Sequence, residues 1–175
     1  MLQSDVRVLE VEPSFLDAKA RTPLKFGSVI VEESTFLHVR ARVETRSGQV
    51  ADGWGAIFLS DMWGWPSQVV PHEQRDNAMR AVATDFCSVV ADVPGCHHPI
   101  DLWMNLEEDL GHTIRDVGAR MDLAEDMPRL CGLNAVSSID AALHDAFALA
   151  NDIGVYDGYS GEFMPRDLSA HLGPA

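Results

Sequence analysis

The chain has 175 residues, 46% of them hydrophobic, which is enough for one domain with a buried core or one domain plus an arm. Its 13 Lys and Arg and 27 Asp and Glu give a net charge of −14, spread along the chain, which excludes nucleic-acid binding because such a surface repels phosphates. The sequence predicts no membrane span and no signal peptide, and its three cysteines, without a CxxC pair, are typical of free thiols in the cytoplasm.

Three segments near the N-terminus have the alternating pattern of strands. They are Val6–Leu16, Thr35–Thr45 and Val50–Leu59, with a Gly-containing turn at residues 46–49 between the second and third. Pro13 places the later part of the first strand at a sheet edge or a bend. These segments predict a three-stranded antiparallel meander over about residues 5–59.

Glycines flank an aromatic residue inside the third strand, at Gly53-Trp54-Gly55. This pattern indicates a β-bulge or a close approach of another backbone.

Two segments are predicted to be loops. Asp17–Gly27 is basic, contains Pro23 and has no sustained periodicity, whereas Ser60–Pro71 is rich in Trp, Gly and Pro. The first would be unusually long for a hairpin connection.

Helices follow the second loop. His72–Asp92 has a stripe of apolar residues, Pro99–Leu110 starts with Pro near its first turn, and Gly111–Met127 has no clear pattern. Asn134–Asn151 is the best-defined helix, because its apolar residues recur at intervals of three and four. The whole pattern predicts an α+β fold in which a meander precedes a bundle of three to four helices.

The C-terminal segment is short. Gly154 ends the last helix, so we expect a domain over residues 1–153 and a connector over residues 154–175.

Candidate catalytic or metal-binding residues are few. Asp140 and His144 lie four residues apart on one helix face, as an acid–base couple or a metal pair would, but ordinary surface pairing has the same spacing. Asp145 lies about 140° around the helix from Asp140, too far for a carboxylate pair. Ser137 and Ser138 lack a nucleophile elbow.

Two further candidates contain cysteine. His97 and His98 beside Cys96 resemble metal ligands, but we expect a solvated polar loop there. Cys131 precedes a helix start, where the dipole would lower its pKa, although a buried structural thiol is the simpler interpretation.

The order of these motifs resembles the N-terminal capping domain of the enolase superfamily, in its mandelate racemase and muconate lactonizing enzyme branch. The residues that carry the resemblance are Pro23, Phe26 and Gly27, the GWG of residues 53–55, and the IDAALHDAFALA of residues 139–150. His144 stands where the family usually has Trp, and Ala150 or Asn151 where Lys is common.

The resemblance implies that this domain covers a following (β/α)-barrel, which holds the Lys or His base and the carboxylates that bind Mg²⁺. In the family, Mg²⁺ stabilises the enediolate formed when a proton leaves the carbon next to a carboxylate, often in a sugar acid. The base and metal ligands are therefore expected outside this chain, which would be inactive alone and contain no cofactor.

The resemblance also implies two loops that close over the barrel, at residues 18–27 and 54–65. Cations would meet an anionic substrate and aromatic residues would shield it. The candidate lid residues are Lys19, Arg21, Lys25, Phe26, Trp54, Trp63 and Trp65. For the three tryptophans, a local aromatic core that anchors a long loop is the alternative.

Two other functions stay open at this point. One is an interaction module that associates with itself or with a separate barrel chain through an exposed apolar surface. The other is a small independent enzyme, which requires Asp140, His144 or Cys131 to converge on one pocket.

Overall fold

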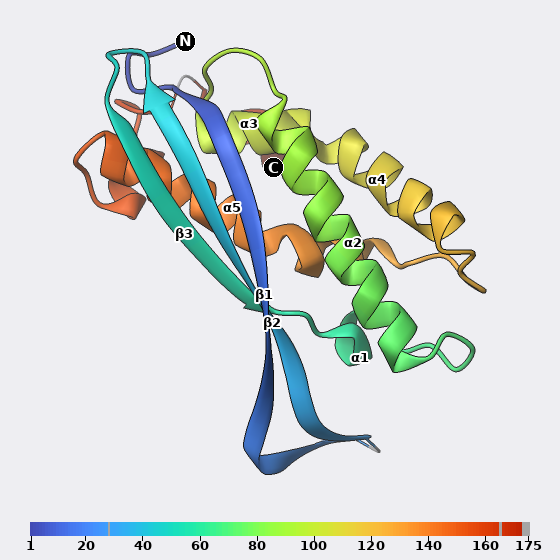
Figure 1. Cartoon of the computed structure of the whole chain (residues 1–175). Coiled ribbons are helices and arrows are strands. Elements are labelled where there is room, and N and C mark those ends of the chain that lie inside the picture. The colour runs from blue at the N-terminus through green and yellow to red at the C-terminus, as the bar shows by residue number, and fades with distance from the viewer. Residues whose placement is uncertain (28, 165, 173–175) are drawn as a thin grey trace.

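The structure, a computed structural model, describes residues 1–27, 29–164 and 166–172 (Figure 1). Its sheet is a meander of β1 (Val6–Phe26), β2 (Val29–Thr45) and β3 (Val50–Phe58), all antiparallel and in the order β1-β2-β3. The predicted meander is confirmed, and Pro13 lies on an edge strand as expected. Gly48, with a φ of +87°, makes the turn between β2 and β3.

The predicted loop at Asp17–Gly27 is wrong, because β1 continues through it to Phe26 and pairs with β2 from Val29 onward. Only the stretch between Lys19 and Leu24 departs from regular register. The paired strands beyond Leu16 and Phe36, residues 17–35, therefore form a ribbon, which we call the arm. It projects beyond the helices, at the end of the sheet opposite the N-terminus (Figure 1).

Four helices of seven residues or more occur in the part of the chain that the structure describes, as predicted. They are α2 (His72–Ala91), α3 (Pro99–Asn105), α4 (Glu107–Arg120) and α5 (Arg129–Ala150), with shorter turns at α1 (Asp61–Gly64), η1 (Val155–Tyr159) and α6 (Ser169–Leu172).

Three predicted boundaries differ from the structure. The helix expected at Pro99–Leu110 is interrupted at Leu106, after which α4 takes in most of the unassigned segment. The last helix begins five residues before Asn134, directly after Pro128, whose fixed φ suits the entry to a helix. The loop at Ser60–Pro71 contains α1.

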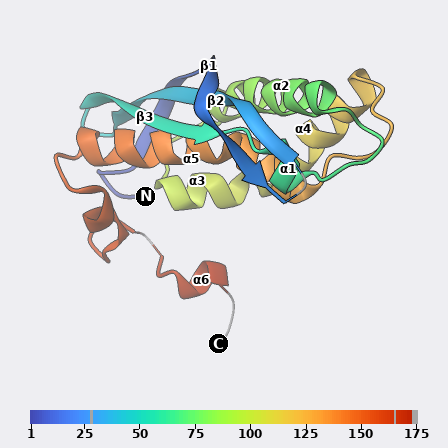
Figure 2. The same cartoon turned by 90° about the horizontal axis from the view of Figure 1, so that it is seen from below.

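The core lies between the sheet and the helices, which cover one face of the sheet only (Figure 2). Leu37, Val39, Ala41 and Val43 of β2 are fully buried against this layer. These four side chains face the helices together because they belong to every second residue, and side chains alternate between the two faces along a strand.

Gly53 and Gly55 bring β3 against α5. A Cβ at Gly53 would overlap the backbone of Ala142 and Ala146, and one at Gly55 would overlap the backbone of Ser138. The β2–β3 register is continuous across both residues, so the glycines serve a close backbone approach and not a bulge.

The first part of the predicted connector packs on the domain. Gly158 and Met164 are buried, and Phe163 packs edge-on against Phe147 of α5 at a centroid distance of 6.3 Å. The predicted connector therefore starts with a segment that packs against α5, and the boundary at residue 153 stays a prediction.

Candidate functional site

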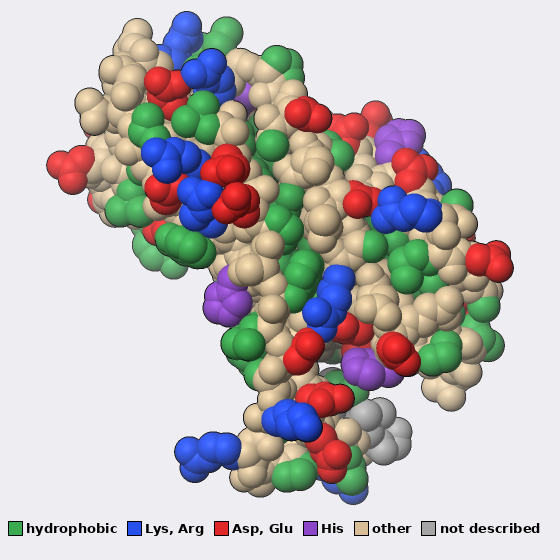
Figure 3. Space-filling view, in the orientation of Figure 1, with side chains coloured by type: hydrophobic (Ala, Val, Ile, Leu, Met, Phe, Trp, Pro, Cys, Tyr) green, Lys and Arg blue, Asp and Glu red, His purple; other side chains and the backbone are tan. Residues whose placement is uncertain are grey.

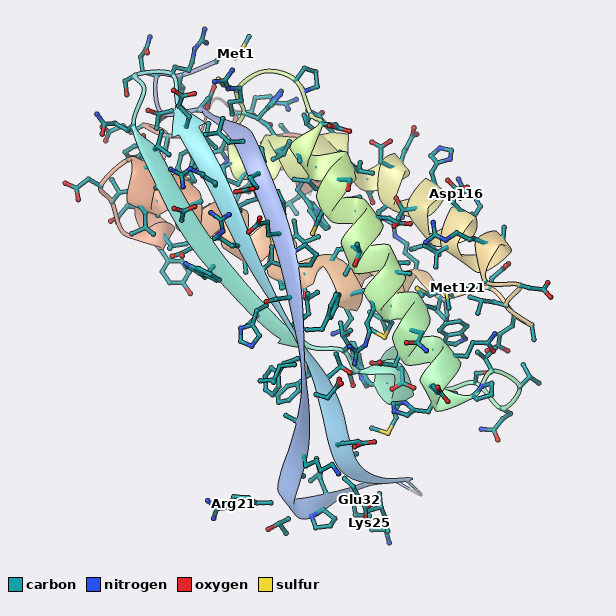
Figure 4. The ribbon with its side chains drawn as sticks, in the orientation of Figure 1. Met1, Arg21, Lys25, Glu32, Asp116 and Met121 are labelled. Carbon is teal, nitrogen blue, oxygen red and sulfur yellow. The ribbon has the colours of Figure 1, made fainter. Side chains whose placement is uncertain are left out.

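The arm presents the predicted lid cations to solvent. Lys19, Arg21 and Lys25 are exposed, and Figure 4 shows Arg21 and Lys25, with Glu32, at the free end of the arm. The side chain of Phe26, also predicted for the lid, lies outside the described part of the structure. The arm thus carries a small basic group well away from the core.

This basic group is unusual within the chain. Lys19 and Lys25 are its only lysines. Most arginines lie in ion pairs, at Arg7, Arg40, Arg42, Arg75, Arg80, Arg120, Arg129 and Arg166. Among the described residues, no ion pair holds Lys19, Arg21 or Lys25, so their charge is available to an anion.

A polar network fixes the base of the arm. Arg80 of α2 donates to Asp17 and Thr35 of the arm and, through Nε, to Asp76 at 2.7 Å. The Arg80 guanidinium lowers the pKa of the Asp17 carboxyl, chiefly by hydrogen bonding. The network ties both strands of the arm to α2, and these polar contacts fix the direction of the arm.

A second network holds α1. Asp61 is 2% exposed and accepts hydrogen bonds from Arg75 Nε at 2.8 Å and from His72 Nδ1 at 2.9 Å. Ser60 N–H donates to Asn134 Oδ1 of α5 at 3.1 Å. Because a buried carboxylate needs such partners, this set anchors α1 beside the arm.

A groove of about 290 Å³ separates the arm from α1. Its lining is mostly apolar: Leu24, Val31, Ser34, Phe58, Ser60, Met62 and Trp63. A neighbouring hollow of about 360 Å³ shares five of these residues and adds the polar side chains of His72, Arg75 and Glu33. Small-molecule sites combine apolar walls with a few polar groups in this way.

The three lid tryptophans occupy different environments. Trp63 is 53% exposed and lines the groove, whereas Trp65 is 1% exposed and donates from Nε1 to Glu125 Oε1 at 2.6 Å. Trp54 is 60% exposed on the sheet face without helices, opposite Arg40. Trp63 is therefore the tryptophan placed beside a cavity, and Trp65 anchors its segment from inside.

Asp140 and His144 do not converge with Cys131. Nine residues of α5 separate Cys131 from Asp140, a rise of about 13 Å. His144 instead lies beside Tyr159, whose hydroxyl is 3.2 Å from His144 Nδ1. The other ring nitrogen, His144 Nε2, is 3.6 Å from Asp140 Oδ1. Burial lowers the pKa of His144 to about 4, so the imidazole is neutral at pH 7.

The two cysteine-containing candidates are structural. Burial raises the pKa of Cys131 to about 12, which opposes the lowering expected from a helix dipole. His98 is buried, contrary to the predicted solvated loop: its Nδ1 accepts from Ile100 N–H at 3.2 Å, and its Nε2 bonds Gly158 O at 3.0 Å. It caps α3 and holds the C-terminal segment.

The described residues contain no group of three His, Cys, Asp or Glu side chains arranged to hold a metal ion. Within the same residues, no helix is both long and apolar enough to cross a membrane. The three cysteines are free thiols.

Sequence reasoning missed the Asp61–Arg75–His72 network and the groove beside it. Asp61 begins α1 in a loop rich in Trp and Gly, and the sequence contains no periodic signal there. The one available signal was a lone acidic residue in an otherwise uncharged segment, which gives no partner.

No protein-family model matches the chain, and no curated protein matches it. Solved structures do share its fold. A mandelate racemase/muconate lactonizing enzyme-like protein from Rubrobacter xylanophilus is 18% identical, with a TM-score of 0.50, over 87% of this chain and 33% of that one.

Two others match less closely in shape. An enolase from Bradyrhizobium, complexed with magnesium and mandelic acid, is 13% identical with a TM-score of 0.47 over 89% of this chain and 35% of its own. The L-Ala-D/L-Glu epimerase from Bacillus subtilis is 15% identical with a TM-score of 0.45, over 89% of this chain and 34% of the epimerase chain. The chain thus spans about a third of the length of the solved structures it matches, and the predicted resemblance is confirmed at the level of the fold.

Proposed function

We propose that this chain is a capping domain that closes over the mouth of a (β/α)-barrel, with the arm and α1 as its two lid segments. The observation that carries the proposal is the position of these segments. They lie together at one end of a fold shared with a third of the Rubrobacter protein, and the groove between them opens to solvent.

Three exposed cations on the arm support an anionic substrate. Lys19, Arg21 and Lys25 are exposed and free of ion pairs among the described residues, on a chain whose net charge is −14. In a closed, water-poor site, such cations interact strongly with a carboxylate. The lid residues that we propose to face substrate are these three and Trp63, while Trp65 supports α1 from the core.

The chemistry of the complete enzyme is part of the proposal. By resemblance, the barrel binds Mg²⁺ and abstracts the proton next to a carboxylate, leading to racemisation, dehydration or cycloisomerisation of a small carboxylate such as a sugar acid. This chain contributes substrate selection and exclusion of water, and catalysis belongs to the barrel. We propose residues 154–175 as the path toward that barrel, and the cytoplasm as the location, in keeping with three free thiols.

The test is a titration of this chain with the barrel of the Rubrobacter protein, expressed without the third that this fold matches. Binding should tighten when Mg²⁺ and a dicarboxylate occupy the barrel, by about tenfold, because the arm then gains an anionic partner. The triple variant K19E/R21E/K25E should keep the basal affinity and lose this gain.

The matched control is R46E/R115E/R120E, which makes the same change in net charge away from the arm and should keep the gain. Absence of a complex, or a gain that survives reversal of the arm charges, would contradict the lid role.

A further inference from the structure

The sheet has a face that no helix covers. Helices pack against the face of β2 that carries Leu37 and Val39, and the opposite face is open (Figure 2). The β2–β3 register is continuous, and the β1–β2 register is regular from Glu10 to Lys19, so side chains of this open face form rows across the three strands. We call it the outer face.

The row nearest the arm is apolar. Leu16, Phe36 and Phe58 lie opposite one another on the three strands, and the rings of Phe36 and Phe58 are 3.7 Å apart. Leu16 is 58% exposed and Phe58 49% exposed. Trp54, 60% exposed, lies on the same face two rows away, so the outer face carries a cluster of solvent-exposed apolar groups.

The rows at the other end are charged and mutually paired. Arg40 lies between Glu12 and Asp52, with Nη1 to Asp52 Oδ1 at 2.8 Å and Nη2 to Glu12 Oε2 at 2.7 Å, and it also bonds Glu10. Arg42 bonds Asp52 at 3.3 Å. Figure 3 shows this mixture of basic and acidic side chains over the upper part of the sheet. The outer face is therefore close to neutral.

The charge of the molecule is divided unevenly between its layers. The three strands contain six Lys and Arg and seven Asp and Glu, a net charge of −1. All remaining residues contain seven and twenty, a net charge of −13. Two copies that approach through helices repel each other strongly, whereas two that approach through their sheets do not.

We infer that the outer face is an interface between two copies of this chain, packed sheet against sheet about a twofold axis. A second copy fits because it presents the same apolar row and the same nearly neutral rows, and because a closed twofold contact satisfies both at once. The interface shares Phe58 with the lining of the groove, whereas the end of the arm lies outside it. The two residues substituted in the test of the interface, Leu16 and Trp54, do not line the groove.

The size of the contact predicts a weak dimer. The half-exposed Leu16, Phe58 and Trp54 offer roughly 100 Å² each, and the neighbouring rows bring each copy to the lower part of the range for specific interfaces. We therefore expect a dissociation constant on the order of 10–100 μM.

Sedimentation velocity of the full chain, from about 1 to about 500 μM, tests this inference. The wild type should shift from monomer to dimer over that range. Raising NaCl from about 0.05 to 0.5 M should strengthen the dimer, because salt screens the repulsion between the helical layers. An interface made of ion pairs would weaken instead.

The variant L16E/W54E should weaken the dimer by about 30-fold or more, because it places like charges opposite each other in a desolvated contact. Its matched control is V69E/L149E, two residues that are 61% and 56% exposed away from the outer face, which should dimerise as the wild type does. Circular dichroism melts confirm that both variants fold. A wild type that stays monomeric in both salts, or an L16E/W54E variant that still dimerises, overturns the inference.

Discussion

Gly53 and Gly55 set the distance between β3 and α5. Each has an α5 backbone atom where its Cβ would lie, and backbone, unlike the end of a flexible side chain, does not move aside at low cost. The sequence pattern of two glycines around a tryptophan pointed to a close approach or a bulge. It did not identify the partner, because Ala142 and Ala146 are about ninety residues away.

Gly53→Ala should therefore lower the free energy of unfolding by about 3 kcal/mol. Urea unfolding measures this, with Gly118→Ala as the matched control: its nearest neighbour would be Leu123 Cδ1 at 3.9 Å. The control should gain about 0.5–1 kcal/mol, because Ala favours a helix over Gly. A Gly53→Ala protein as stable as the wild type would show that the approach is not close.

His144 makes the stability of the domain depend on pH. It packs between Tyr159 and His98, with ring centroids 5.4 and 6.2 Å away. Burial lowers its pKa to about 4, and desolvation lowers the pKa of His98 in the same direction. Between the ordinary histidine value and pH 4, the unfolded chain thus binds more protons than the folded one, and stability falls as the pH falls.

From pH 7 to pH 5 the wild type should lose about 2 kcal/mol through His144. His144→Phe keeps an aromatic ring and removes the titration, so its loss over the same interval should be smaller by about that amount. Burial raises the pKa of Asp140, and a carboxyl that binds its proton more readily in the folded state opposes this trend. Equal losses in both proteins, measured by urea unfolding at each pH, would show that His144 does not couple to folding.

At the scale of elements, the meander, α2 and the body of α5 were predictable because each has a strong hydrophobic period. The arm was not predicted, although Ala18, Ala20, Leu24 and Phe26 alternate with Asp17, Lys19, Arg21 and Lys25. Its basic composition and Pro23 concealed this alternation. An alternating pattern that includes small residues is weak, because neither face of the arm is buried in a core.

The candidate site, like the fold, could be predicted from the sequence only in part. The resemblance placed Lys19, Arg21, Lys25 and Trp63 in two predicted lid loops, and the structure has these residues in the arm and α1. A core position for Trp65 was one of two alternatives, and the bond between Asp61 and Arg75 was not predicted, since both depend on contacts with later parts of the chain. Long-range contacts of single polar residues leave no period in a sequence.

At the scale of the whole molecule, the two layers have separate roles. The residues outside the three strands carry a net charge of −13, and the sheet carries the arm, both lysines and the open outer face. These properties suit the proposed cap over a barrel. The proposed cap and the proposed dimer share Phe58 but are tested at different residues, so one can fail without the other.

The central proposal is that this chain serves as a cap and that catalysis belongs to a barrel. Its most direct test is ¹H NMR of the pure chain in D₂O with Mg²⁺ and a panel of sugar acids and aryl-substituted hydroxy acids. The account predicts no deuterium at the carbon next to the carboxylate beyond that in a protein-free control. Incorporation above the control by the chain alone, lost in His144→Phe, would contradict it.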